Sequence, residues 1–173
     1  MKRKINVWDY AGTIIEHMGK GILLTAKADG RPNTMTIGWG TLGIEWGKPI
    51  CIVYVRQSRY TKELLDKNGE FTVNVPMGAI DKNILAVCGT KSGRDMDKFE
   101  VLGLTEEAPE IISVPGIKEL PLTLECKVIY KQDQDPAAIA KENDDRYYAK
   151  GTANEGDYHT AYYGQILSAY IIE

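Results

Sequence analysis

The chain has 173 residues and a formal net charge of −3, and no block of basic residues stands out. Nucleic acid is not an expected partner, because binding to its phosphate backbone needs a clustered basic surface. We expect no membrane span either, because no apolar run approaches the roughly 20 residues that a bilayer requires. The length predicts a single domain, residues 1–173, that buries roughly 70% of its unfolded surface.

The N-terminus, MKRKINVWDY, carries charge but lacks the apolar centre of a signal peptide, so we expect a cytoplasmic protein. The cysteines Cys51, Cys88 and Cys126 show no CxxC spacing, which argues against zinc and thioredoxin-like chemistry. The two histidines, His17 and His159, are far apart. We therefore predict no metal site.

The first strand is expected over 21–28, and Asp29-Gly30 predicts a tight hairpin turn because both residues tolerate positive φ. Pro32 starts the return strand, which carries Asn33 to Trp39. Residues 50–55 are apolar or aromatic throughout and predict a strand buried on both faces.

After Arg56, a helix is expected from Tyr60 to about Lys67, with Ser58 as its N-cap and Asn68-Gly69 as its stop. Alternation over 71–75 predicts a half-buried strand. Asp81 is expected to cap a second helix over 82–87, and residues 88–98 to form a loop.

A long alternating strand is expected over 122–131, and the last strand over 159–172. The polar segment 133–156 between them predicts an excursion with one short helix. About six strands with few helices indicate a closed or partly closed barrel.

One cluster carries a chemical signal: Arg56, Ser58, Arg59 and Thr61 place two cations and two hydroxyls beside a helix N-terminus. Such a start offers free backbone N–H groups and partial positive charge, which suits a phosphate monoester. The spacing is equally compatible with a capped surface helix whose arginines are solvated. Tyr60 would cover the ligand or pack locally.

Several segments, in this order and spacing, resemble the flavin reductase-like family, close to its flavoredoxin branch. They are NTMTIGWG at 33–40, RQSRYT at 56–61, GEFTVNVP at 69–76, CGTKSGRDMDKF at 88–99 and HTAYYG at 159–164. The resemblance implies a mainly β fold, a split β-barrel of Greek-key type that binds FMN, with two or three peripheral helices.

The resemblance also implies where FMN binds. The arginine and hydroxyl cluster would hold the phosphate, and residues 33–36 would present backbone groups to the polar edge of the isoalloxazine. Trp39 would form part of an apolar wall, and the 88–98 segment would lie near the flavin and a subunit interface. The predicted cofactor residues are Asn33, Thr34, Met35, Thr36, Trp39, Arg56, Ser58, Arg59, Tyr60, Thr61, Cys88, Ser92 and Lys98.

No catalytic residue is assigned; His159 is a weak candidate, and a structural role for it is equally open. A catalytic thiol at Cys88 is disfavoured, because no resolving cysteine lies nearby in sequence. The chemistry would belong to the cofactor.

The implied function is an FMN-dependent oxidoreductase that passes electrons from NAD(P)H or a protein donor through FMN to an acceptor. No GxGxxG unit is present, so a nicotinamide would have to stack directly on the flavin. The alternatives are a non-catalytic flavin carrier or store, and a barrel that has lost flavin binding.

A homodimer is also implied, with FMN at or near the interface, besides a small-molecule or protein redox partner. The final strand and the tyrosine pairs 147–148 and 162–163 support a dimer independently, since they offer more aromatic surface than one small barrel readily covers.

Overall fold

Eight antiparallel strands form the main sheet of the computed structural model, which describes residues 1–173. The strands follow the order β3-β2-β6-β9-β10-β5-β4, and β1 pairs with β10. The sheet strands are β1 (Lys2–Lys4), β2 (Ile22–Ala28), β3 (Arg31–Ile37), β4 (Gly40–Glu45), β5 (Lys48–Arg56), β6 (Glu70–Val75), β9 (Leu122–Asp133) and β10 (His159–Ile172). A separate short hairpin joins β7 (Glu106–Glu107) and β8 (Gly116–Ile117).

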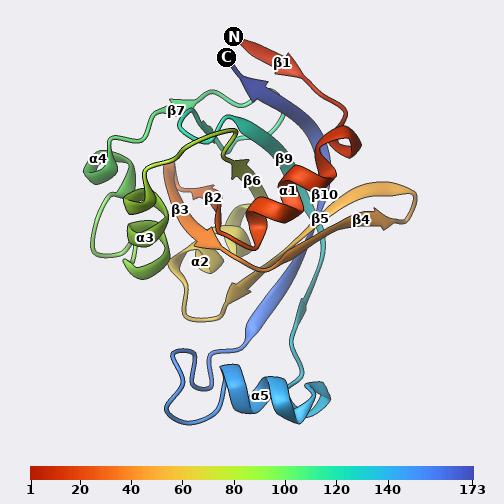
Figure 1. Ribbon diagram of the computed structural model, residues 1–173, viewed down its shortest axis with the longest axis vertical. Coiled ribbons are helices and arrows are strands. Elements are labelled where there is room, and N and C mark those ends of the chain that lie inside the picture. Colours follow the sequence, from red (N-terminus) through yellow and green to blue (C-terminus); the bar gives the residue numbers. More distant parts are fainter.

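The mainly β antiparallel architecture is confirmed. The sheet curls around its core, but the end strands β3 and β4 do not pair with each other, so closure into a barrel stays a prediction (Figure 1). The number of strands is larger than the six expected, because β1, β7 and β8 have only two or three residues, and the two glycines of β4 interrupt its alternating pattern.

Five α-helices are present, where two or three were expected: α1 (Ala11–Met18), α2 (Tyr60–Asn68), α3 (Lys82–Thr90), α4 (Lys98–Leu102) and α5 (Lys141–Tyr147). Single 3₁₀ turns lie at Val7–Tyr10 and Pro136–Ala138. The predicted loop over 88–98 is therefore partly wrong. Its first residues end α3, and Asp97 caps α4 by accepting from the N–H groups of Phe99 and Glu100. No helix is long and apolar enough to cross a membrane.

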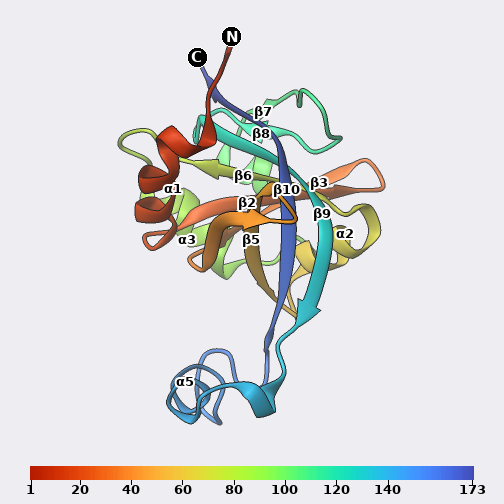
Figure 2. The same ribbon diagram turned by 90° about the vertical axis from the view of Figure 1, so that its right-hand side faces the viewer.

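The excursion between β9 and β10 extends away from the sheet as a separate lobe that carries α5 (Figures 1 and 2). It contains one α-helix, as predicted, together with the 3₁₀ turn. The hairpin turn at Asp29-Gly30 is also confirmed, with φ values of 52° and 77°.

Burial of three strands differs from expectation. The outer face of β6 and of the first half of β9 is covered by the 103–121 segment, so both strands are buried on both faces there. Glu125 of β9 is fully buried and accepts hydrogen bonds from the N–H groups of Glu110, Ile111 and Ile112, which fix this covering segment. The reverse holds for β5, where Ile52 and Tyr54 remain partly exposed because no element of the chain covers that face.

Candidate functional site

A polar cavity of about 170 Å³ lies between β3, the β5–α2 turn and the loop after α3; we call it the anion pocket. Its lining contains five cationic side chains and no acidic one. The predicted residues that line it are Asn33, Met35, Arg56, Ser58, Arg59, Tyr60, Thr61, Ser92 and Lys98. Sequence reasoning missed Thr90, Lys91, Gly93 and Arg94, although all four lie in the segment quoted for the family resemblance.

Two of the cations are held without any carboxylate. Lys98 is 3% exposed, and its Nζ donates to the carbonyl oxygens of Thr34 at 2.9 Å and Cys88 at 3.1 Å. Arg59 Nη2 donates to the carbonyl of Gly89 at 2.8 Å. The last turn of α3 supplies two of these carbonyls, at the negative end of the helix dipole. Carbonyls orient both cations, and neither cation forms an ion pair with a carboxylate.

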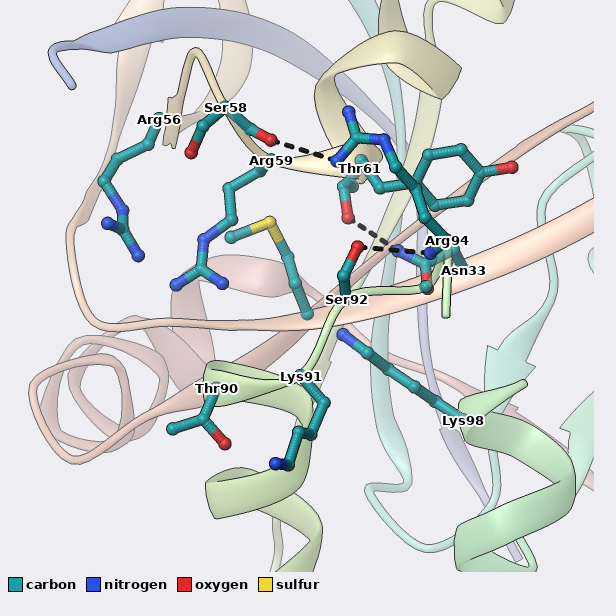
Figure 3. A pocket seen from close by; sticks show the side chains of 13 residues that line it. Asn33, Arg56, Ser58, Arg59, Thr61, Thr90, Lys91, Ser92, Arg94 and Lys98 are labelled. Atoms are coloured by element: carbon teal, nitrogen blue, oxygen red, sulfur yellow. Dashed lines mark hydrogen bonds between the residues drawn. The ribbon is translucent and has the colours of Figure 1, made fainter. Parts of the chain in front are cut away.

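Four polar groups at this pocket have hydrogens without an acceptor in the protein; Figure 3 shows Thr61, Ser92 and Lys98 close together, with Arg59 to one side. Arg59 Nη1 and the third N–H of Lys98 make no hydrogen bond within the protein. Thr61 Oγ accepts from Asn33, so its own hydrogen is available. Ser92 Oγ accepts from the N–H of Arg94 and likewise keeps its hydrogen.

A charge-assisted hydrogen bond to a cation contributes roughly 1.5–3 kcal/mol, which a bound anion would gain from these groups. Burial lowers the pKa of Lys98 to about 8, an effect that nearby Arg59 reinforces. Burial likewise lowers the pKa of Arg59, with Arg56 acting in the same direction. Asp157 opposes the shift of the Arg59 pKa. Five cationic side chains and several hydroxyls line the pocket, and this donor set fits a phosphate monoester.

The pocket wall is fixed by close packing of the loop after α3. A Cβ atom at Gly93 would collide with the amide side chain of Asn33 and the ring of Tyr60. Only glycine allows the loop to lie this close to β3 and α2. Arg94 then reaches over Tyr60, donates to the carbonyl of Ser58 at 3.2 Å and pairs with Glu63.

The predicted role of Ser58 as N-cap is wrong. Arg59 occupies the N-cap position of α2 and makes no side-chain cap. The N–H and hydroxyl of Ser58 donate instead to Asp157, at 3.0 and 2.6 Å. Asp157 also lies 3.5 Å from Arg56, so it partly neutralises the first arginine of the predicted cluster.

A second cavity, of about 210 Å³, adjoins the first and shares Met35, Arg56 and Arg59 with it; we call it the aromatic pocket. The other lining residues are Thr36, Ile37, Gly38, Trp39, Tyr54, Asn154 and His159. Tyr54, Asn154, Ile37 and Gly38 were not predicted; Asn154 lies in the excursion, which carried no motif. The two cavities together follow β3 from Asn33 to its end.

Trp39 is 38% exposed and packs against His159, with ring centroids 4.8 Å apart, and against the edge of Tyr147 at 5.0 Å. Burial lowers the pKa of His159 to about 4, and Arg56 adds to that effect. The imidazole is therefore neutral at ordinary pH.

Two predicted residues do not line either cavity. The Thr34 side chain is buried and donates to the carbonyl of Leu24. Cys88 is fully buried, and burial raises the pKa of its thiol to about 11. Both contribute to the anion pocket only through their carbonyl oxygens.

Comparison with known families gives one match: residues 17–173 fit the model of the flavin reductase like domain. A curated but uncharacterised protein of Archaeoglobus fulgidus is 36% identical over 99 residues, which cover 57% of this chain and 55% of that protein. The chain thus spans about half the length of this relative. The uncharacterised protein YddH of Escherichia coli K12 is 28% identical over 86% of this chain and 75% of its own length.

Solved structures of the same fold include a flavoredoxin from Methanosarcina acetivorans, with a TM-score of 0.66 and 28% identity over 88% of this chain and 68% of that one. An NADH:FAD oxidoreductase of Streptomyces globisporus has a TM-score of 0.64 and 17% identity, over 88% of this chain and 75% of that one. At that identity the second likeness concerns the fold alone.

Proposed function

The chain belongs to the flavin reductase-like domain family, and from this membership and the geometry of its pockets we propose that it binds FMN as a redox cofactor. The observation that carries the proposal is a pair of cations, the half-buried Arg59 and the buried Lys98, that are held by carbonyl oxygens and form no ion pair with a carboxylate. A phosphate monoester brings nearly two negative charges and three acceptor oxygens to such a site.

Each part of the chain has a separate task in this proposal. Arg59, Thr61, Ser92 and Lys98 would hold the phosphate, and the aromatic pocket would take the ring system. Met35, Ile37 and Trp39 would exclude water from the ring. When bound, FMN would supply a ring that accepts a hydride or electrons and passes them on.

We propose an oxidoreductase of the flavin reductase or flavoredoxin type, supplied with electrons by NAD(P)H or by a protein donor. The match to the flavin reductase like domain and the likeness to a flavoredoxin at 28% identity support this class of reaction.

An absorption spectrum of the purified protein, before and after addition of FMN, tests the cofactor. A chain that neither carries nor takes up flavin would contradict the proposal. NADH and NADPH oxidation by the flavin-loaded protein then tests the reaction. Bound flavin that oxidises neither nucleotide and exchanges no electrons with a protein donor would identify a flavin store instead.

We also propose that the chain forms a homodimer through the outer face of β4, β5, β9 and β10. Trp46, Tyr130 and Tyr163 form a row of rings there, with centroids 6.3 and 4.9 Å apart. Ile44 is 72% exposed and Trp46 is 62% exposed nearby. The face continues along β5 to Tyr54, which lines the aromatic pocket, so a second copy would also cover part of the site.

The tyrosine pairs that suggested a dimer from sequence contribute less than expected. Tyr148 and Tyr162 are buried within the chain, at 5% and 1% exposure. Of the two pairs, Tyr163 lies on the proposed face, and the most exposed apolar side chains there are Ile44, Trp46 and Tyr130.

A further inference from the structure

The imidazole of His159 is held by two side chains of the excursion, one just after β9 and one just after α5. Its Nδ1 lies 2.7 Å from the phenolic oxygen of Tyr148. That oxygen is also 3.0 Å from Oε1 of Gln134. Gln134 Oε1 in turn accepts the backbone N–H of His159 at 2.9 Å.

These contacts determine where the hydrogens lie. The backbone N–H of His159 fixes the Gln134 amide, because the opposite orientation would place two donors against each other. The contact between Gln134 Oε1 and the Tyr148 oxygen joins two oxygens, so the phenolic hydrogen must lie between them. Tyr148 therefore has no hydrogen left for His159, and Nδ1 must carry the proton and donate it to the phenolic oxygen.

The other ring nitrogen faces a different environment. Nε2 makes no hydrogen bond within the protein and is not among the buried atoms that lack a partner, so it is accessible. His159 itself is 8% exposed and lines the aromatic pocket, which is the space that Nε2 can reach. Burial and the charges of Arg56 and Arg59 disfavour a second proton on the ring, while Asp157 opposes them, with a net lowering of the pKa.

We propose that Tyr148 and Gln134 are positioning residues that lock His159 as the Nδ1–H tautomer, so that Nε2 presents a lone pair to the aromatic pocket. The pocket then selects a planar ligand that offers an N–H or O–H at this point. A ligand with only a carbonyl or carboxylate there would meet a second acceptor. The lock follows from this chain's own contacts, whereas the identity of that ligand as a flavin or its redox partner rests on the proposed function.

Nitrogen-15 NMR of the histidine rings tests the lock directly, in the purified protein before and after FMN is added. The chain has two histidines, and His17→Gln assigns the signals. We expect His159 to show a protonated Nδ1 and a bare Nε2 between pH 6 and 8. A protonated Nε2, or an averaged pair of tautomers, would overturn the inference.

Three variants separate the lock from simple packing. Gln134→Leu removes the acceptor of the phenolic hydrogen, which should turn to Nδ1 and move the ring proton to Nε2. Gln134→Glu keeps an acceptor and should keep the Nδ1–H tautomer. Tyr148→Phe retains the ring but removes its oxygen and should give a mixture of tautomers. An unchanged spectrum in Tyr148→Phe would show that Tyr148 does not set the tautomer.

Phenol and anisole then test the selection of a donor, since anisole replaces the phenolic hydrogen with a methyl group. In the wild-type chain we expect phenol to move the Nε2 resonance and anisole to leave it in place. In Gln134→Leu this difference should disappear. Equal shifts by the two probes in the wild type would overturn the donor selectivity. Failure to bind FMN, measured separately, would contradict the proposed function and leave the tautomer result standing.

Discussion

The carboxylate of Asp157 accepts two hydrogen bonds from Ser58, one from its N–H at 3.0 Å and one from its hydroxyl at 2.6 Å. The residues are 99 positions apart in the chain. The bonds fasten the end of the excursion to the start of α2, next to both pockets. An internal carboxylate thus occupies the donors that the sequence assigned to a phosphate.

Replacing Asp157 with Asn should therefore strengthen the phosphate contribution to binding. The variant removes a negative charge beside Arg56 and leaves that arginine free to attract an anion. The ratio of FMN to riboflavin affinity should rise about two- to fivefold, the size of a screened charge interaction. The ratio cancels any effect of a loosened excursion on the ring. Flavin fluorescence titration measures it, and a lower ratio would contradict the assignment.

Arg59→Ala should weaken FMN binding by about tenfold to a hundredfold, the value of one lost charge-assisted hydrogen bond. Riboflavin lacks the phosphate, so its affinity should barely change. Lys91→Ala is the matched control, because Lys91 is an exposed cation at the rim of the same pocket. Equal losses of affinity for both flavins in Arg59→Ala would contradict the assignment of the FMN phosphate to this pocket.

The anion pocket shows how many of its residues could be predicted from the sequence alone. Short stretches of sequence show the arginine and hydroxyl cluster, the start of α2 and the family resemblance. Together these predict most of the residues that line the anion pocket. The hydrogen bonds between Ser58 and Asp157 could not be predicted, because Asp157 is distant in sequence and lies in a segment without a motif. Arg94 and Gly93 were within a quoted segment, but only the close approach to Asn33 and Tyr60 reveals why the loop lies there.

The burial of the strands likewise depends on contacts that the sequence pattern does not reveal. Hydrophobic patterns over β6 and β9 predict one buried face, yet the 103–121 segment covers the other face with polar anchors such as Glu125. The second face of β5 is apolar in sequence but uncovered in the single chain. A local pattern reports which residues can be buried, and the covering element is set by tertiary contacts.

FMN affinity should fall as the pH rises above about 8. Free Lys98 has a pKa lowered to about 8 by burial, and a bound phosphate would raise it again. Binding above that pH must therefore take up a proton, so the affinity should decrease by up to about tenfold per pH unit. Lys98→Arg stays charged and should flatten the profile. Riboflavin titrations supply the baseline, and an equally steep profile for riboflavin would refute the role of Lys98.

Removing the thiol of Cys88 should leave the chemistry intact. The side chain is fully buried and its pKa is raised to about 11, so little thiolate is available as a nucleophile. Cys88→Ala should retain bound flavin and most NAD(P)H or electron-transfer activity. Flavin content measures the retained cofactor, and initial rates measure the activity. Loss of activity with flavin still bound would show that the thiol of Cys88 is catalytic.

The last prediction concerns the uncovered face of β5 and its neighbours. A stable interface buries roughly 1,200–2,000 Å² in total, and its centre is rich in aromatic residues. Ile44→Glu with Trp46→Glu should break a dimer there, because each change places a charge on a side chain that is mostly exposed in the monomer. Both changes lie outside the two pockets, so the fold and the local site are preserved.

Light scattering should give twice the 19.3 kDa chain mass for the wild type and one chain mass for the double variant. Flavin affinity should fall in the variant, since the face extends along β5 to Tyr54 at the aromatic pocket. Ile111→Glu is the control, because Ile111 is 59% exposed on the segment over β9 instead. A wild-type monomer, or a monomeric variant that binds FMN with full affinity, would place the whole flavin site within one chain.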